Sequence, residues 1–229
     1  MKKLGCTPSV HKETTLSIRN YITPTLVYPP EAAWHKARDS WASKANNEHG
    51  CCVTLGVKQL LDCYHALASF DFISIPDSTV ILEATQNDAL EGWSILECLE
   101  TWRDKGMFGN KLDAFAAIPL GRPGVLKAMI YELGGVKCGV QLPEDWMQTT
   151  TWESDRFAHI AGGHDIVILG YDADWYYGIS WGEVVRISQA AIDNHFFELW
   201  APVNELWYKD RETPSGFDSA ALIRDTRAL

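Results

Sequence analysis

The sequence predicts an α+β fold in which a helical lobe precedes a lobe built on an antiparallel sheet. Before residue 135, apolar residues recur every three or four positions in several stretches, the spacing of helices with one buried face. From Val136 onward the apolar runs are short, rich in β-branched and aromatic residues, and separated by turn residues, which is typical of strands. A nucleophile and a base carried by the two halves would face each other across one cleft.

Residues 1-45 predict an extended segment followed by a short helix. Prolines between residues 24 and 30 favour extended backbone, and residues 31 to 45 then predict a helix that places Trp34 and Trp41 against the body. No internal repeat or low-complexity tract interrupts this part or any other.

Residues 46-135 form the predicted helical lobe. The expected helices cover residues 53 to about 70, 77 to 84, 95 to 104 and 123 to 133. Asp77 is the expected cap of the second helix. Lys105-Gly106 and Gly134-Gly135 provide the C-terminal stops of the third and fourth helices.

Residues 136-208 form the predicted β lobe, and residues 209-229 a C-terminal arm that is either docked or loose. The expected strands are Val136–Leu142, His164–Tyr171, Trp175–Trp181, Val184–Ser188 and Phe196–Trp200. A hairpin turn is expected at residues 172–174. The aromatic residues of the third strand are expected either in the core or on a cleft wall that binds substrate.

Composition narrows the classes of function. The formal charge is -10, and no cluster of Lys and Arg is present, which argues against a nucleic-acid partner. No apolar run reaches the roughly 18 residues of a membrane span, and Leu4 to Thr15 contains no apolar signal core. We therefore expect a soluble protein without a membrane partner, cytoplasmic unless carried in an assembly.

The six cysteines show no Cys-x-x-Cys pair, and no paired-histidine spacing accompanies them. A zinc site is therefore not expected, and neither is any other metal or cofactor.

A candidate nucleophile and a candidate base stand out. Cys52 follows a polar loop that begins at Asn46 and enters the first predicted helix. A helix N-terminus favours the thiolate, and a basic partner would favour it further. His164 is the best such partner, because it lies at the mouth of a buried strand entered through two glycines.

These residues resemble the papain-like cysteine peptidases. Three short motifs occur in the same order as in that family: Gly50-Cys51-Cys52, Gly163-His164 through Gly170-Tyr171, and Ser180-Trp181-Gly182. The resemblance is closest to uncharacterised papain-like proteins of bacteria and phages, and it covers roughly residues 45 to 208.

The resemblance implies an acyl-transfer site. Cys52 would be the nucleophile and His164 the general base and then acid, while the Asn46 amide would help to stabilise the oxyanion. The family's third catalytic residue, an Asn directly before Ser-Trp, is Ile179 here. Counting from the histidine, Ser180 takes that place, so either Ser180 or a backbone carbonyl would orient the imidazole.

Two neighbours of these residues carry expectations of their own. Asp165, next to His164 on a strand, should point to the opposite face. Cys51 is a spectator, an alternative nucleophile, or a disulfide partner of Cys52.

The expected activity is that of a papain-like thiol hydrolase acting on a peptide or protein substrate. The alternative is a catalytically retired papain-fold protein that serves a structural or binding role, for example in a phage virion with virion proteins as partners. A protein-crosslinking amide transferase is a chemical variant of the first. No propeptide-like segment is evident, and the oligomeric state is left open.

Overall fold

The computed structural model describes residues 2–23, 26–68, 74–208 and 217–229. The helices are α1 (Ala45–Glu48), α2 (Cys52–Ala68), α3 (Asp77–Gln86), α4 (Ile95–Asp104), α5 (Pro123–Leu133), α6 (Gln189–His195), α7 (Glu205–Tyr208) and α8 (Ser219–Thr226). The strands are β1 (Cys6–Thr7), β2 (Ala32–Ala33), β3 (Trp93–Ser94), β4 (Ala114–Ala117), β5 (Val136–Pro143), β6 (Thr151–Trp152), β7 (Ile160–Tyr171), β8 (Trp175–Ser180), β9 (Glu183–Ser188) and β10 (Phe196–Val203). Short 3₁₀ helices lie at Ile18–Tyr21, Trp34–Lys36 and Glu144–Met147. The predicted α+β order is confirmed.

One sheet organises the second half of the chain. Its strands follow the order β4-β10-β5-β7-β8-β9-β6, and β2 pairs with β7 outside this path. Neighbours are antiparallel except β6 and β9, which are parallel. The long strand β7 has β5 on one side and β8 on the other, so both neighbours fix its position.

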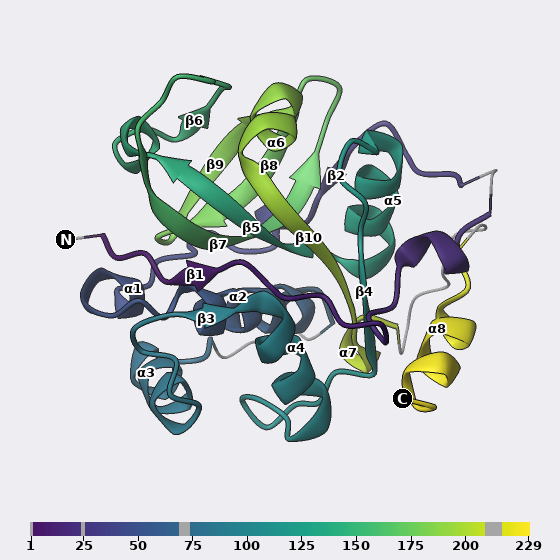
Figure 1. Cartoon of the computed structure of the whole chain (residues 1–229). Helices are drawn as coiled ribbons and strands as arrows, with labels where there is room; N and C mark the ends of the chain where they lie inside the picture. Colours follow the sequence, from purple (N-terminus) through teal and green to yellow (C-terminus); the bar gives the residue numbers. More distant parts are fainter. Residues whose placement is uncertain (1, 24–25, 69–73, 209–216) are drawn as a thin grey trace.

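The two faces of β7 belong to different packing layers. Val167 and Leu169 pack with the apolar face of α2, whereas Ile166 and Ile168 pack with that of α5. This division follows from the two-residue alternation of side chains along a strand. In Figure 1, α1 to α4 lie on one side of a boundary and the sheet on the other, and α2 and β7 meet at that boundary.

Two local predictions were wrong. Asp77 does not cap α3: it is the first residue of the helix, and its carboxylate accepts hydrogen bonds from Ser43 Oγ at 2.6 Å and Lys44 N at 2.7 Å. Residues 31–45 form no single helix. A short strand and one 3₁₀ turn are followed by irregular backbone, and Trp41 reaches the core from that irregular part.

The helical half also contributes a strand that the sequence analysis missed. β4 pairs with β10 at the edge of the sheet, with Ala117 opposite Trp200. Its sequence, Ala-Phe-Ala-Ala, is short and lacks the β-branched residues that signal a strand.

The C-terminal arm is docked over residues 217–229. Phe217 and Leu222 are buried, and Asp218 N donates to Tyr21 O at 2.8 Å. The predicted arm also includes residues 209–216, which lie outside the described residues.

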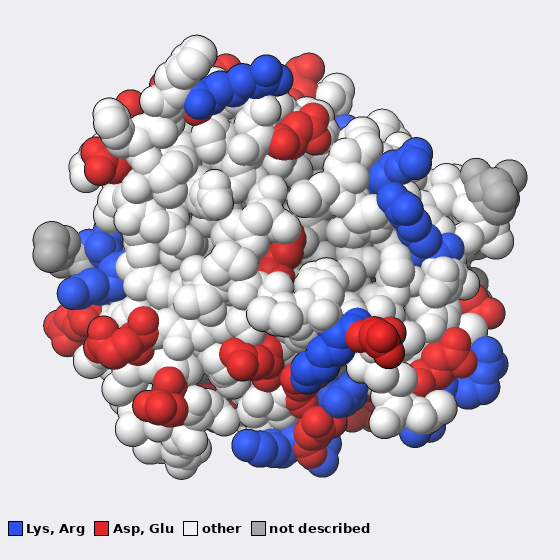
Figure 2. All heavy atoms as spheres, in the orientation of Figure 1, with Lys and Arg blue, Asp and Glu red and all other residues white. Residues whose placement is uncertain are grey.

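On the face shown in Figure 2, charged side chains of both signs lie mainly around the rim and in the lower part. The broad area between them is white except for an acidic group near its centre. Within the described ranges, no helix combines the length and the apolarity that a bilayer crossing requires.

Candidate active site

Cys52 is the first residue of α2, as the apolar spacing predicts. Its side chain is 2% exposed and packs in the core between α2 and β7. The sulfur accepts a hydrogen bond from the backbone N–H of Asp165. Asp165 directly follows His164 on β7, so the contact between α2 and β7 joins the first turn of this helix to the strand that carries the base candidate.

The neighbouring thiol packs elsewhere. Cys51 belongs to a small cluster with Leu55 and Val80, beneath α3. None of the six cysteines, all of which lie in the described residues, forms a disulfide, so the predicted alternative of a Cys51–Cys52 bond is wrong. Of the two thiols, only Cys52 packs against β7.

Two contacts hold the His164 ring, a hydrogen bond and an aromatic stacking contact. Its Nε2 lies 3.1 Å from Ser180 Oγ, and its ring stacks on Trp181 with centroids 4.1 Å apart and planes 9° from parallel. The indole shields the hydrogen bond from water, which strengthens it. Nδ1 is buried and has no hydrogen-bond partner among the described residues, which leaves it free for a proton.

Strand alternation explains why Ser180 and not Ile179 meets the imidazole. Ile179 opposes Val167 across the β7–β8 pair, and both pack beneath α2. The next residue, Ser180, therefore points to the opposite face of the sheet, which is the face of His164. Asp165 points the other way, as predicted, toward α2 and Lys137.

The segment Lys3–Thr7, which we call the covering segment, lies over this site. Gly5 N donates to Gly163 O at 3.2 Å, and Gly5 O accepts from Trp93 N at 2.8 Å. Strand β1 at its end runs parallel to β3. Figure 1 shows it along the boundary between the helices and the sheet, which explains why His164 is only 2% exposed.

Glycines allow this close approach. A Cβ on Gly5 would lie 1.9 Å from Gly50 O, and a Cβ on Gly163 would lie 1.9 Å from Cys6 O. Neither position can hold a side chain unless the backbone moves. No sequence pattern predicts the covering segment; the signal for it is these glycines on three separate stretches of chain.

Asn46 binds the covering segment through both its side chain and its backbone. Its Nδ2 donates to Lys3 O at 3.0 Å, and its carbonyl accepts from Lys3 N at 3.1 Å. The indole Nε1 of Trp181 donates to the same Lys3 oxygen at 3.3 Å. The amide expected to stabilise an oxyanion therefore binds the backbone carbonyl of Lys3.

Burial holds both titratable groups in their neutral forms. Desolvation, then the Asp165 charge, raise the pKa of Cys52 to about 12. Desolvation, then the charge of Lys2, lower the pKa of His164 to about 3. At neutral pH the covered site therefore holds a thiol and a neutral imidazole, in place of the reactive ion pair.

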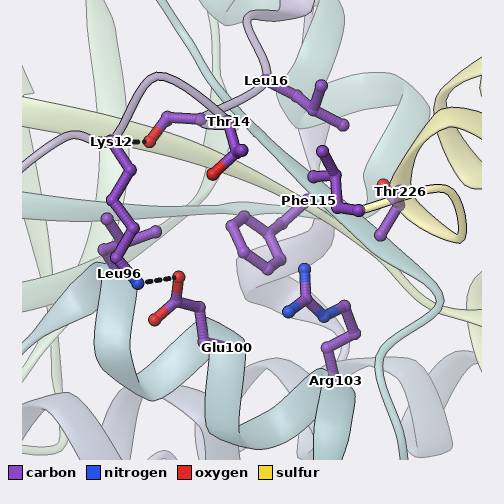
Figure 3. Close-up of a pocket in the computed structure, with 10 residues that line it drawn as sticks. Lys12, Thr14, Leu16, Leu96, Glu100, Arg103, Phe115 and Thr226 are labelled. Carbon is purple, nitrogen blue, oxygen red and sulfur yellow. Dashed lines mark hydrogen bonds and ion pairs between the residues drawn. The ribbon is translucent and has the colours of Figure 1, made fainter.

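A separate hollow of about 130 Å³ lies between α4, residues 12–16 and the C-terminal residues. Figure 3 shows Lys12 paired with Glu100 at 2.6 Å and Arg103 beside Phe115. None of the proposed catalytic residues lines it. In the described part of the chain, no group of three or more His, Cys, Asp or Glu could hold a metal ion.

No protein-family model matches the chain, and no curated protein matches it significantly in sequence. Solved structures do resemble it. Xylellain, a cysteine protease from Xylella fastidiosa, aligns with a TM-score of 0.72 and 9% identity over 89% of this chain and 96% of its own. ProCathepsin B from Trypanosoma congolense aligns with a TM-score of 0.67 and 9% identity over 89% of this chain and 86% of its own.

A plant enzyme extends the likeness. The cysteine protease CMS1MS2 of Carica candamarcensis gives a TM-score of 0.57 and 14% identity over 77% of this chain and 99% of its own. At such identities the likeness concerns the fold and not the activity. The chain has the fold of the papain-like cysteine proteases.

Proposed function

We propose that the chain is a thiol hydrolase that cleaves a peptide or related amide bond. The observation that carries the proposal is the hydrogen bond between His164 and Ser180, with the imidazole stacked on Trp181, on the strand that packs against the helix of Cys52. The imidazole is oriented even though Ile179 replaces the usual Asn. A retired site would have no need for this second arrangement.

The proposed chemistry begins when the covering segment leaves the cleft. His164 takes the proton from Cys52, and the thiolate attacks the carbonyl carbon of the substrate. Asn46 Nδ2 and the backbone N–H of Cys52 then donate to the oxyanion. His164 returns the proton to the leaving amine, and a water molecule that it deprotonates hydrolyses the thioester and restores the thiol.

Opening would also return the pKa values of Cys52 and His164 toward their ordinary values. Desolvation is the largest cause of both shifts, so water entering the cleft lowers the pKa of Cys52 and raises that of His164. Both changes favour the thiolate–imidazolium pair. The N-terminus of α2 favours the thiolate further.

A peptide substrate is supported by the backbone groups that line the cleft. Gly163 O and Trp93 N already bind the two backbone polar groups of Gly5. An extended peptide could take the same two bonds once the covering segment is displaced.

The test is hydrolysis of a peptide library followed by mass spectrometry, with the whole chain and with matched cysteine variants. Cys52→Ala should abolish cleavage and Cys51→Ala should retain it, because Cys51 packs beneath α3. Cleavage that survives Cys52→Ala would overturn the assignment of the nucleophile.

The second candidate is a retired papain-fold protein that binds partners, virion proteins among them. The closed cleft and the neutral thiol favour it. The rate of iodoacetamide labelling distinguishes the two candidates. In an active hydrolase Cys52 should react faster than the buried thiols Cys98 and Cys138, whereas in a retired protein all three should react equally slowly.

A further inference from the structure

One residue of the covering segment lies against a wall made of backbone. A Cβ on Gly5 would meet three atoms of Gly50: its O at 1.9 Å, its C at 2.6 Å and its Cα at 2.8 Å. Such atoms cannot turn aside as the end of a flexible side chain can, because they belong to the chain itself. The place that Gly5 occupies therefore accepts glycine and excludes residues that carry a Cβ.

Two more glycines of the cleft approach the covering segment as closely as their lack of a side chain permits. A Cβ on Gly163 would lie 1.9 Å from Cys6 O, and a Cβ on Gly92 would lie 3.1 Å from Gly5 O. Gly163 belongs to β7, Gly92 directly precedes β3, and Gly50 lies in the loop before α2. Three separate stretches of backbone thus set the width of the cleft at this point.

The same stretches hold the occupant through its own backbone. Gly5 N donates to Gly163 O at 3.2 Å, and Gly5 O accepts from Trp93 N at 2.8 Å, so one bond comes from the sheet and one from the helical side. Both bonds require the close approach that glycine allows. The covering segment leaves another group of the cleft unused, since Asn46 Oδ1 is buried without a hydrogen-bond partner among the described residues.

This narrow point lies next to the proposed reaction centre. Gly50 precedes Cys52 by two residues, and Gly163 directly precedes His164. A peptide that followed the path of the covering segment would therefore pass its enclosed residue close to both proposed catalytic groups. The bond that is cleaved should lie beside that residue.

We propose that the cleft selects glycine, so that the substrates of the hydrolase are peptides or protein segments that carry glycine beside the cleaved bond. After the covering segment leaves, the substrate glycine takes the place of Gly5 between Gly163 O and Trp93 N. A residue with a Cβ is held away by Gly50 and loses both hydrogen bonds. The inference rests on the proposed function, since it names the class of substrate for the same cleft.

The first measurement is cleavage of a peptide library by the whole chain, with the cut positions located by mass spectrometry. Glycine should be enriched at one fixed position beside the cut. In a synthetic copy of a cleaved peptide, alanine in place of that glycine should lower kcat/KM about thirtyfold, the equivalent of two hydrogen bonds. Alanine at a position further from the cut is the matched control and should leave kcat/KM nearly unchanged.

The second measurement tests the selection without catalysis. The probe is a fluorescent decapeptide with the sequence of residues 1–10, kept reduced, and its binding to the whole chain carrying Gly5→Ala is followed by fluorescence anisotropy. The peptide with alanine in place of Gly5 should bind about thirtyfold more weakly. The peptide with alanine in place of Thr7 is the control, because the Thr7 side chain is exposed. The unaltered chain, measured in parallel, should show the same preference at lower affinity.

Cleavage with no fixed glycine overturns the inference and leaves the proposed hydrolase intact. Equal binding of the glycine and alanine decapeptides overturns it as well. Glycine-selective binding without any cleavage supports selection by the cleft, whereas the proposed function then fails. If the chain neither cleaves nor binds any of these peptides, both the proposed function and the inference are overturned.

Discussion

Replacing Gly5 by alanine should open the site without touching any proposed catalytic residue. The new Cβ would lie 1.9 Å from Gly50 O, whereas carbon and oxygen in contact need more than 3 Å. Gly50 is enclosed as well, because a Cβ on it would lie 2.8 Å from Leu4 O. The clash must therefore be relieved by moving the covering segment away from the cleft.

The size of the effect follows from the bonds that Gly5 makes. Displacement breaks its hydrogen bonds to Gly163 O and from Trp93 N, each worth about 1 kcal/mol. A loss of about 2 kcal/mol raises the ratio of open to closed forms by about thirtyfold. If labelling proceeds only through the open form, the rate at Cys52 should rise by the same factor.

The assay is iodoacetamide labelling at neutral pH, with the modified cysteine located by mass spectrometry and the fold checked by near-ultraviolet circular dichroism. Thr7→Ala is the matched control, because Thr7 lies in the same segment with its side chain exposed. It should label at the rate of the unaltered chain. Cys51 should stay slow in both variants, since it packs in a different cluster.

The reasoning is refuted if the Gly5→Ala protein is folded and Cys52 still labels at the original rate. The covering segment would then not control access to the thiol. Faster labelling of every cysteine would mean general unfolding, which also contradicts the prediction.

Three further outcomes are expected. Ser180→Ala removes the partner of the imidazole and should slow peptide cleavage about tenfold, the equivalent of one hydrogen bond; an unchanged rate would mean that Ser180 does not orient His164. Ile179→Asn should not raise activity and should lower the urea midpoint, because position 179 faces the core; a gain in activity would contradict the observed register. Burial raises the pKa of Glu132 from 4.5 to about 8, so stability should fall as pH rises between these values. The free energy of unfolding of Glu132→Gln, relative to that of the unaltered chain, should therefore rise by up to about 1.4 kcal/mol per pH unit over this range. A difference that stays constant with pH would refute this.

Much of the fold could be predicted because its signals are periodic. The helix that starts at Cys52 and the strand that carries His164 both show long apolar patterns, and the structure contains both. β4 was not predicted, because its four residues, three of them alanine, show no clear alternation of apolar and polar side chains. Asp77 was misassigned because its carboxylate finds partners in a distant loop, and no local pattern reveals them.

Two parts of the candidate site were predictable from local sequence. The spacing from histidine to asparagine in the papain-like family identified Ser180, and strand alternation placed Asp165 on the other face. The covering segment and the Lys137 contact were not predictable in this way. Each depends on residues more than 80 positions apart in sequence, such as Lys137 and Val53, which only the packed chain brings together.

The covering segment acts on both members of the proposed catalytic pair through the same physical cause. Coverage removes water from Cys52 and His164, and desolvation is the largest cause of both pKa shifts. The Asp165 charge raises the pKa of Cys52 further, and the Lys137 charge, which lowers it, is the smaller of the two. Reactivity is therefore expected to depend on a backbone movement at Gly5, because entry of water removes the largest of these causes.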